Sequence, residues 1–110
     1  MTNNKRLALE LALIAGLFIS TANAEMKQYH AIRQSPCSVN LDAAASLMTA
    51  LKNNDEEAVE ALVAKGKVIL LPEGKRFAGL PFEYGLIHGY VKSGSHIGDK
   101  CYAIGRTMAE

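Results

Sequence analysis

Residues 54–74 read NDEEAVEALVAKGKVILLPEG, and within this stretch the apolar pattern changes from a helical period to a strand. The first half carries three acids where a helix dipole favours negative charge, and its apolar residues recur every three or four positions. Asn54, with Glu57 three residues later, predicts the N-cap, and Gly66 predicts a left-handed helix stop. The continuous apolar run Val68–Leu71 then predicts a strand closed by a Pro-Glu-Gly turn.

A first helix is predicted directly before this stretch, so that residues 40–65 form a helical hairpin. Asn40 or Asp42 can cap it, because both side chains accept hydrogen bonds from the N–H groups of a first helical turn. Its apolar residues stand at helical spacing: Leu41, Ala44, Leu47, Met48 and Leu51. Residues 25–39 contain Pro36 and no sustained period, so we expect an extended or irregular lead-in there.

Residues 66–104 are predicted to form strands and turns. After the first strand come three short segments at 75–80, 84–91 and 100–104. Four glycines punctuate them: Gly85, Gly89, Gly94 and Gly98. Short strands at this spacing are typical of a small barrel or a strongly curved sheet. The sequence therefore predicts one α+β domain over residues 25–110, a helical hairpin followed by a small curved antiparallel sheet or barrel.

The first 24 residues have the layout of a secretory signal peptide. Two basic residues come first, residues 11–19 form an uninterrupted apolar run, and the small residues Ala22 and Ala24 suit the signal peptidase. We expect cleavage between Ala24 and Glu25. The predicted mature chain is then residues 25–110.

An uncleaved membrane anchor is the alternative, and it would need about 20 consecutive apolar residues. The apolar run from Leu7 to Ala22 is shorter and is interrupted by Glu10. We therefore predict a periplasmic or secreted protein with no transmembrane segment in its mature chain.

Cys37 and Cys101 are the two cysteines of the chain, and both lie in the predicted mature part. Exported proteins enter compartments where disulfides persist, so we predict that these residues pair. A bond closing a loop of about 64 residues contributes on the order of 4 kcal/mol in the chain-entropy model. Two free buried thiols are the alternative, and no C-x-x-C pattern favours a metal.

The predicted mature chain is electrically neutral. Of the 12 basic and 11 acidic side chains, removal of the signal takes Lys5, Arg6 and Glu10 and leaves 10 of each sign. Neither this balance nor any basic run favours contact with a phosphate backbone, so no nucleic-acid partner is expected.

No catalytic or metal motif stands out. His88 and His96, with the methionines Met26, Met48 and Met108, have side chains that suit copper, but no two ligands stand at a tight motif spacing. We expect histidines that are exposed or hydrogen-bonded, and no cofactor.

A catalytic serine is a second alternative, because Ser93 and Ser95 lie beside His96 in a glycine-containing turn. Adjacent turn residues rarely point at one another, and no nucleophile elbow is present. We interpret the segment as a polar loop. The acids at 55–57 fit a helix N-terminus better than paired catalytic carboxylates.

Three tyrosines of the strand half form the candidate binding surface: Tyr84, Tyr90 and Tyr102. Tyrosine combines an apolar body with a polar tip, which suits contact surfaces. Alternation along residues 84–91 would place Tyr84 and Tyr90 on one face, either core or binding surface. We favour the core, because a small domain without tryptophan needs its large side chains inside.

The strings GKVILLPEGKRF, LIHGYVKSG and GDKCYAI in residues 66–104 resemble the bacterial Src-homology-3-like domains of exported proteins. In that family a final glycine, aromatic and hydrophobic element closes the barrel; here Tyr102 stands where the family usually has tryptophan. The resemblance implies a small barrel that holds peptides, cell-wall material or a partner domain and seldom performs chemistry.

These observations predict an exported, non-enzymatic binding or scaffolding module of the bacterial cell envelope. Its partner would be a protein or the cell wall. The alternative is a small periplasmic inhibitor or immunity protein that blocks an envelope-targeting enzyme, because such proteins share this size, export and disulfide. An enzyme is the third hypothesis.

Overall fold

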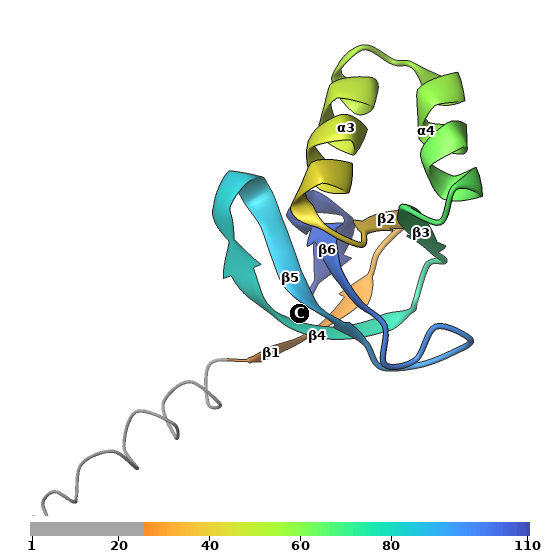
Figure 1. Cartoon of the computed structure of the whole chain (residues 1–110). Helices are drawn as coiled ribbons and strands as arrows, with labels where there is room; N and C mark the ends of the chain where they lie inside the picture. Colours follow the sequence, from red (N-terminus) through yellow and green to blue (C-terminus); the bar gives the residue numbers. More distant parts are fainter. Residues whose placement is uncertain (1–25) are drawn as a thin grey trace, which may run out of the picture.

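The computed structural model describes residues 26–110 as two helices and a seven-stranded antiparallel sheet (Figure 1). The helices are α3 (Leu41–Lys52) and α4 (Glu56–Ala64). The strands are β1 (Lys27–Ala31), β2 (Ser35–Ser38), β3 (Val68–Leu71), β4 (Arg76–Phe82), β5 (Leu86–Val91), β6 (Lys100–Ile104) and β7 (Met108–Ala109). Two 3-10 turns precede β5 and β7: Glu83–Gly85 and Gly105–Thr107. The α+β class expected from the sequence is therefore present.

The predicted signal peptide lies outside the described residues, as do its cleavage residues Ala22, Ala24 and Glu25. Within residues 26–110, no helix is both long enough and apolar enough to cross a membrane.

The strands follow the order β3-β2-β6-β5-β4-β1-β7, and the paired neighbours are antiparallel. β4 and β5 bend strongly, so the sheet is curved (Figure 1). Its two ends, β3 and β7, do not pair with each other within the described part of the chain. The expected curved antiparallel sheet is thus confirmed, whereas the sheet does not close into a barrel.

The lead-in expected at residues 25–39 differs most from its prediction. It contains two strands of the sheet, β1 between β4 and β7, and β2 between β3 and β6. Both strands pair with segments far along the chain, so no local pattern of apolar residues predicts them. Pro36 is tolerated in β2 because pairing with β6 runs only over Cys37 and Ser38, where no proline nitrogen has to donate.

The helical hairpin begins and ends at specific caps. The Asn40 side chain accepts a hydrogen bond from the N–H of Ala43 at 2.8 Å, as one of the two predicted caps. α4 is capped by Asp55 instead of the predicted Asn54, which adopts a left-handed φ of 54° between the helices. Gly66 ends the hairpin with φ 75°, as predicted.

The two faces of the sheet carry two different apolar cores. The disulfide face, named for its cysteines, is filled by strand side chains: Ala31, Cys37, Leu71, Phe77, Ile87, Val91, Cys101, Ala103 and Met108. The helix face contacts the hairpin, where Ala44 and Leu47 of α3 meet Val68, Leu86 and Ile104. Strand alternation separates the two sets, because successive side chains point to opposite faces.

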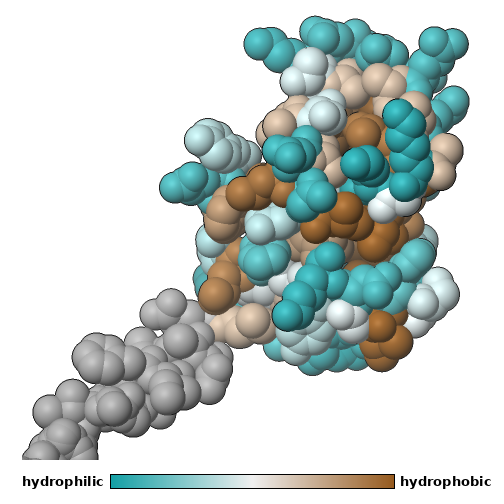
Figure 2. Space-filling model, viewed as in Figure 1, coloured by the Kyte–Doolittle hydropathy of each residue, from teal (hydrophilic) through white to brown (hydrophobic). Residues whose placement is uncertain are grey.

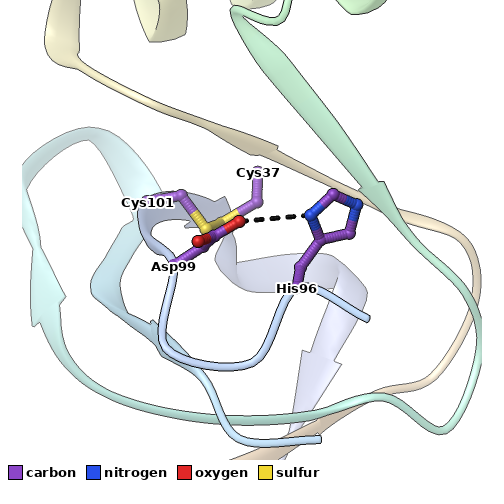
Figure 3. Close-up of polar contacts among 4 residues, drawn as sticks. All are labelled: Cys37, His96, Asp99 and Cys101. Atoms are coloured by element: carbon purple, nitrogen blue, oxygen red, sulfur yellow. Dashed lines mark hydrogen bonds and ion pairs between the residues drawn. A yellow bond between two sulfur atoms is a disulfide. The ribbon is translucent and has the colours of Figure 1, made fainter. Parts of the chain in front are cut away.

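Cys37 of β2 and Cys101 of β6 form the predicted disulfide, with their Cα atoms 5.4 Å apart (Figure 3). β2 and β6 are neighbours in the sheet, so the bond links two adjacent strands separated by 64 positions in the sequence. It lies on the disulfide face, and both cysteines are buried.

Gly79 of β4 and Gly89 of β5 are direct cross-strand partners. A Cβ added to Gly89 would lie 1.9 Å from the carbonyl oxygen of Ala78. Only glycine leaves room for this contact between the two backbones.

Candidate functional site

The three predicted tyrosines occupy three different environments. Tyr84 lies in the 3-10 turn before β5 and is 79% exposed, so the expectation that it belongs to the core is wrong. The alternation that was expected to place it with Tyr90 does not apply, because β5 begins at Leu86. Tyr90 and Tyr102 are half-buried in β5 and β6.

Tyr102 belongs to an aromatic cluster on the part of the helix face that the hairpin leaves open. Its ring stacks on His88, with centroids 4.2 Å apart and an interplanar angle of 9°. Phe82 packs edge-on against both, at 5.3 Å from Tyr102 and 6.2 Å from His88. The three residues come from the adjacent strands β4, β5 and β6.

The strand register builds this cluster. Leu80, His88 and Tyr102 are direct cross-strand partners, and Phe82 lies two residues farther along β4 on the same face. The sequence did not predict Phe82 and His88 as neighbours of Tyr102. These residues are seen to share a face only when the cross-strand register of β4, β5 and β6 is known. The positions of the turns in the sequence do not determine that register.

An apolar groove of about 430 Å³ adjoins the cluster. Tyr84 and Leu86 line it on the sheet side, and α3 lines the other side with Leu41, Ala44, Ala45 and Met48. Leu86 is the cross-strand partner of Phe82, which connects the groove with the aromatic rings. Figure 2 shows apolar residues gathering in a band between the helical hairpin and the strands.

We call the four residues Phe82, Tyr84, His88 and Tyr102, together with this groove, the aromatic surface. Its members are apolar or aromatic, and Tyr84 protrudes most. The surface therefore combines exposed aromatic rings with a hollow beside them, which is the chemistry of a contact site for another molecule.

The two histidines considered as metal ligands lie on different elements, His88 in β5 and His96 in the loop before β6. The Nδ1 atom of His96 lies 3.1 Å from a carboxylate oxygen of Asp99 (Figure 3). Among residues 26–110, no three His, Cys, Asp or Glu side chains group closely enough to hold a metal ion.

Ser93, one of the two serines considered as nucleophiles, has a structural role. The Ser93 hydroxyl oxygen accepts a hydrogen bond from the backbone N–H of Arg76 at 3.1 Å, and so ties the loop to β4. His96 pairs with Asp99 instead. The acids at 55–57 open α4, where Asp55 accepts a hydrogen bond from the N–H of Ala58. Ser93, His96 and Asp55 thus each have a structural partner.

Comparison of the chain with known protein families, with curated proteins and with solved structures finds no match.

Proposed function

We propose that this chain is an exported, non-enzymatic binding or scaffolding module of the bacterial cell envelope, and that the aromatic surface contacts its partner. The observation that carries the proposal is the cluster of Phe82, His88 and Tyr102 with the exposed Tyr84 and the adjoining groove. Exposed contiguous apolar patches on small domains mark sites of interaction.

Ring packing within the cluster of Phe82, His88 and Tyr102, as distinct from the exposed ring of Tyr84, favours a protein partner over a cell-wall glycan. A sugar binds an aromatic residue through an open ring face, but His88 and Tyr102 stack face to face. Phe82 packs edge-on against the same pair. The cluster therefore offers ring edges and polar tips, which suit the mixed apolar and hydrogen-bonding surface of a protein.

The backbone at Tyr84 supports a role in contact. Tyr84 has φ 63° and ψ 25°, a left-handed conformation that costs a side-chain-bearing residue roughly 1–2 kcal/mol. Such conformations are found preferentially at functional sites. The neighbouring Gly85 also has a positive φ, so the turn places a tyrosine, not a second glycine, at its most exposed point.

The resemblance of residues 66–104 to Src-homology-3-like domains supports a binding role, since such domains hold peptides or partner domains. The side chains weighed for catalysis support a non-enzymatic function, because Ser93 and His96 are each hydrogen-bonded to a different partner.

The alternative function, a periplasmic inhibitor or immunity protein, is favoured by one feature. The turn Glu83–Gly85 projects an exposed tyrosine from the end of the β4–β5 hairpin beside a hydrophobic groove. A rigid projecting turn can enter the cleft of an enzyme. In this case the partner of the aromatic surface would be an enzyme that attacks the envelope.

Affinity capture from the envelope fraction tests the proposal. The wild-type protein should retain a specific envelope protein, and Tyr84→Ala and His88→Ala should each reduce its recovery at least ten-fold. A parallel sedimentation with purified cell-wall sacculi should recover little protein. A captured hydrolase that loses activity on binding would favour the inhibitor function.

Ile32→Ala is the matched control, because Ile32 is also an exposed apolar residue but lies in the turn between β1 and β2. This variant should capture the partner as the wild type does. Equal capture by the wild type, Tyr84→Ala and His88→Ala would contradict the proposal. Thermal melts of all variants show whether a loss of capture reflects unfolding.

A further inference from the structure

Charge is divided unequally between the hairpin and the sheet. The hairpin, residues 40–65, carries five acidic and two basic side chains. Residues 26–39 and 66–110, which hold the strands, carry four acidic and eight basic ones. The predicted mature chain is neutral only because these two parts offset each other. The sheet is therefore the basic part of the molecule.

Three basic side chains of the sheet gather at one end of the helix face. Arg76 begins β4 and lies opposite Lys92, whose backbone N–H donates to the Arg76 carbonyl at 2.8 Å. Lys100 begins β6, two residues before Tyr102. Because side chains alternate along a strand, Lys100 shares the face of Tyr102, and Lys92 shares the face of His88 four residues before it. We call Arg76, Lys92 and Lys100 the basic patch.

The positive charge of the basic patch is not neutralised within residues 26–110. The ion pairs of this part of the chain join other residues, and no carboxylate lies within ion-pair distance of the patch. The Lys92 ammonium donates instead to the uncharged amide oxygen of Gln28, at 3.0 Å. Arg76 and Lys92 face each other across β4 and β5, and like charges directly opposite destabilise a sheet. An external anion would relieve this repulsion.

The basic patch and the aromatic surface form one continuous strip along the strands. From Lys92, β5 presents Tyr90, His88 and Leu86 in turn on this face, and Leu86 lines the apolar groove. Each step covers two residues, or about 7 Å, so the strip is about 20 Å long. Along that length it changes from cationic to aromatic to apolar. An extended segment of about seven residues has the same length.

The number of charges in the patch favours protein carboxylates over a lipid surface. Anionic lipids are typically recognised by clusters of about four to eight lysines and arginines. The basic patch has three such residues, spread over two rows of the sheet and continued by aromatic rings. Carboxylates at alternate positions of an extended peptide lie about 7 Å apart, which is also the spacing of the rows. An acidic protein segment therefore matches both the charge and its spacing.

We propose that the aromatic surface binds an acidic protein segment, whose carboxylates meet the basic patch while its apolar end enters the groove. This inference rests on the proposed binding function and adds the charge of the partner and the arrangement of the segment along the strip. Charge complementarity of this kind accelerates association and selects among partners.

Two synthetic peptides probe the strip: acetyl-Glu-Thr-Glu-Thr-Phe-Thr-Leu-amide and its reverse, acetyl-Leu-Thr-Phe-Thr-Glu-Thr-Glu-amide. In an extended chain the Glu, Phe and Leu side chains of each peptide point to one side, with both carboxylates at one end. The two sequences cover both directions along the strands. Versions with Gln in place of Glu keep the shape and remove the charge, so they isolate the effect of the carboxylates.

The readout is NMR titration of the purified wild-type protein. The tighter-binding Glu peptide should shift the backbone amides of Tyr90, Lys92 and Lys100, with an affinity at least ten-fold above that of its Gln version. Raising NaCl from about 0.05 M to about 0.5 M should weaken its binding several-fold, because salt screens exposed charges. No shift with either Glu peptide at its solubility limit would overturn the proposal. So would equal affinities of the Glu and Gln versions.

A triple variant tests the basic patch from the protein side. Arg76→Gln, Lys92→Gln and Lys100→Gln together remove the charge and keep long polar side chains. The affinity for the Glu peptide should fall at least ten-fold, to the level of the Gln peptide. Lys100→Glu, at an exposed strand end, should weaken binding at least three-fold and answers the question if the triple variant does not fold. Unaltered binding by a folded variant would contradict the proposal.

A second triple variant is the matched control. Arg33→Gln, Lys52→Gln and Lys65→Gln together change the net charge equally, at exposed positions in the turn between β1 and β2 and in the last residues of the two helices or just beyond them. This variant should bind the Glu peptide within two-fold of the wild type. Equal losses in the two triple variants would show that net charge alone governs binding, and would overturn the proposal.

Other anionic occupants are outcomes of the same titration. Vesicles of phosphatidylglycerol with phosphatidylcholine, and inorganic polyphosphate, should bind more weakly than the Glu peptide. Tighter binding of either would replace the acidic segment and overturn the proposal. A second copy, whose hairpin is acidic, would also do so if concentrating the peptide-free protein shifted the same three amides.

Envelope capture separates this inference from the proposed function. Undiminished capture by the folded triple variant of the basic patch would refute the acidic segment and leave the aromatic surface as the contact site. Equal capture by the wild type, Tyr84→Ala and His88→Ala, with the Glu peptide still binding the patch, would refute the proposed contact site alone. The two failures are therefore distinguishable.

Discussion

The disulfide face and the helix face of the same sheet are used differently. The disulfide face is filled by side chains of its own strands and crossed by the Cys37–Cys101 bond, and its central residues are almost fully buried. The helix face is covered by the hairpin only around Val68, Leu86 and Ile104, and the remainder displays aromatic rings. Both faces therefore bury a core, but only the helix face also displays exposed aromatic rings beside its core.

Loss of the disulfide, on the face that is almost fully buried, should lower the free energy of unfolding more than any other change. The double variant Cys37→Ser with Cys101→Ser should lower the free energy of unfolding by about 4 kcal/mol, because the unfolded chain regains the freedom of a long loop. Urea denaturation measures the change. Reductant should lower the wild type to the value of the variant and leave the variant unaffected. A wild type equally stable with and without reductant would contradict the prediction.

Crowding the contact between β4 and β5 at Gly89 should have the next largest effect on stability. Gly89→Ala places a methyl group against the Ala78 carbonyl and should cost about 3 kcal/mol, measured by thermal or urea denaturation. Gly105→Ala is the matched control, because its Cβ would meet the Gly85 carbonyl oxygen at the longer distance of 2.9 Å. It should cost less. Equal losses at the two glycines would show that close strand approach is not the cause.

Replacing each of two buried serines by alanine should change the free energy of unfolding in opposite directions. The Ser38 hydroxyl on the helix face has no hydrogen-bond partner within residues 26–110, so Ser38→Ala should raise the free energy of unfolding by about 1 kcal/mol. Ser35 is equally buried but its hydroxyl bonds to that of Thr107, so Ser35→Ala should lower it by about 1 kcal/mol. Calorimetry of both variants measures the difference. A change of the same sign in both would refute this explanation.

Truncation at the exposed turn should have the smallest effect on stability. Tyr84→Ala should change the free energy of unfolding by no more than about 0.5 kcal/mol, because the side chain is mostly in solvent and the left-handed backbone is retained. Tyr102→Ala should cost more, because its ring packs against His88 and Phe82. Equal losses in the two melts would mean that Tyr84 is part of the core after all.

Local chemistry made much of the fold predictable. Val68–Leu71 and residues 100–104 form strands with the predicted bounds, because each is a short apolar run between turn residues. The cap of α4 was predicted one residue early, since Asn54 and Asp55 both accept hydrogen bonds from backbone N–H groups. Asn54 takes the left-handed turn conformation that asparagine tolerates well, which leaves Asp55 to cap.

The rest of the fold depends on contacts between distant residues. β1 and β2 are short and lack a clean alternation, so only their partners in the sheet define them. The predicted strand at residues 84–91 began two residues too early, because Tyr84 adopts a positive φ that is unusual for tyrosine and that its sequence neighbours do not signal. The aromatic cluster required the cross-strand register of three strands.

The strand order also has a consequence for how this chain folds. β1 lies between β4 and β7, and β2 lies between β3 and β6, so each of these two strands completes its pairing only with β7 or β6, near the far end of the domain. Contacts this distant in sequence slow the search for the native state. The helical hairpin, which needs only its own neighbours, can form while the remainder is still being made. Cys37 stays an unpaired thiol until Cys101 reaches it.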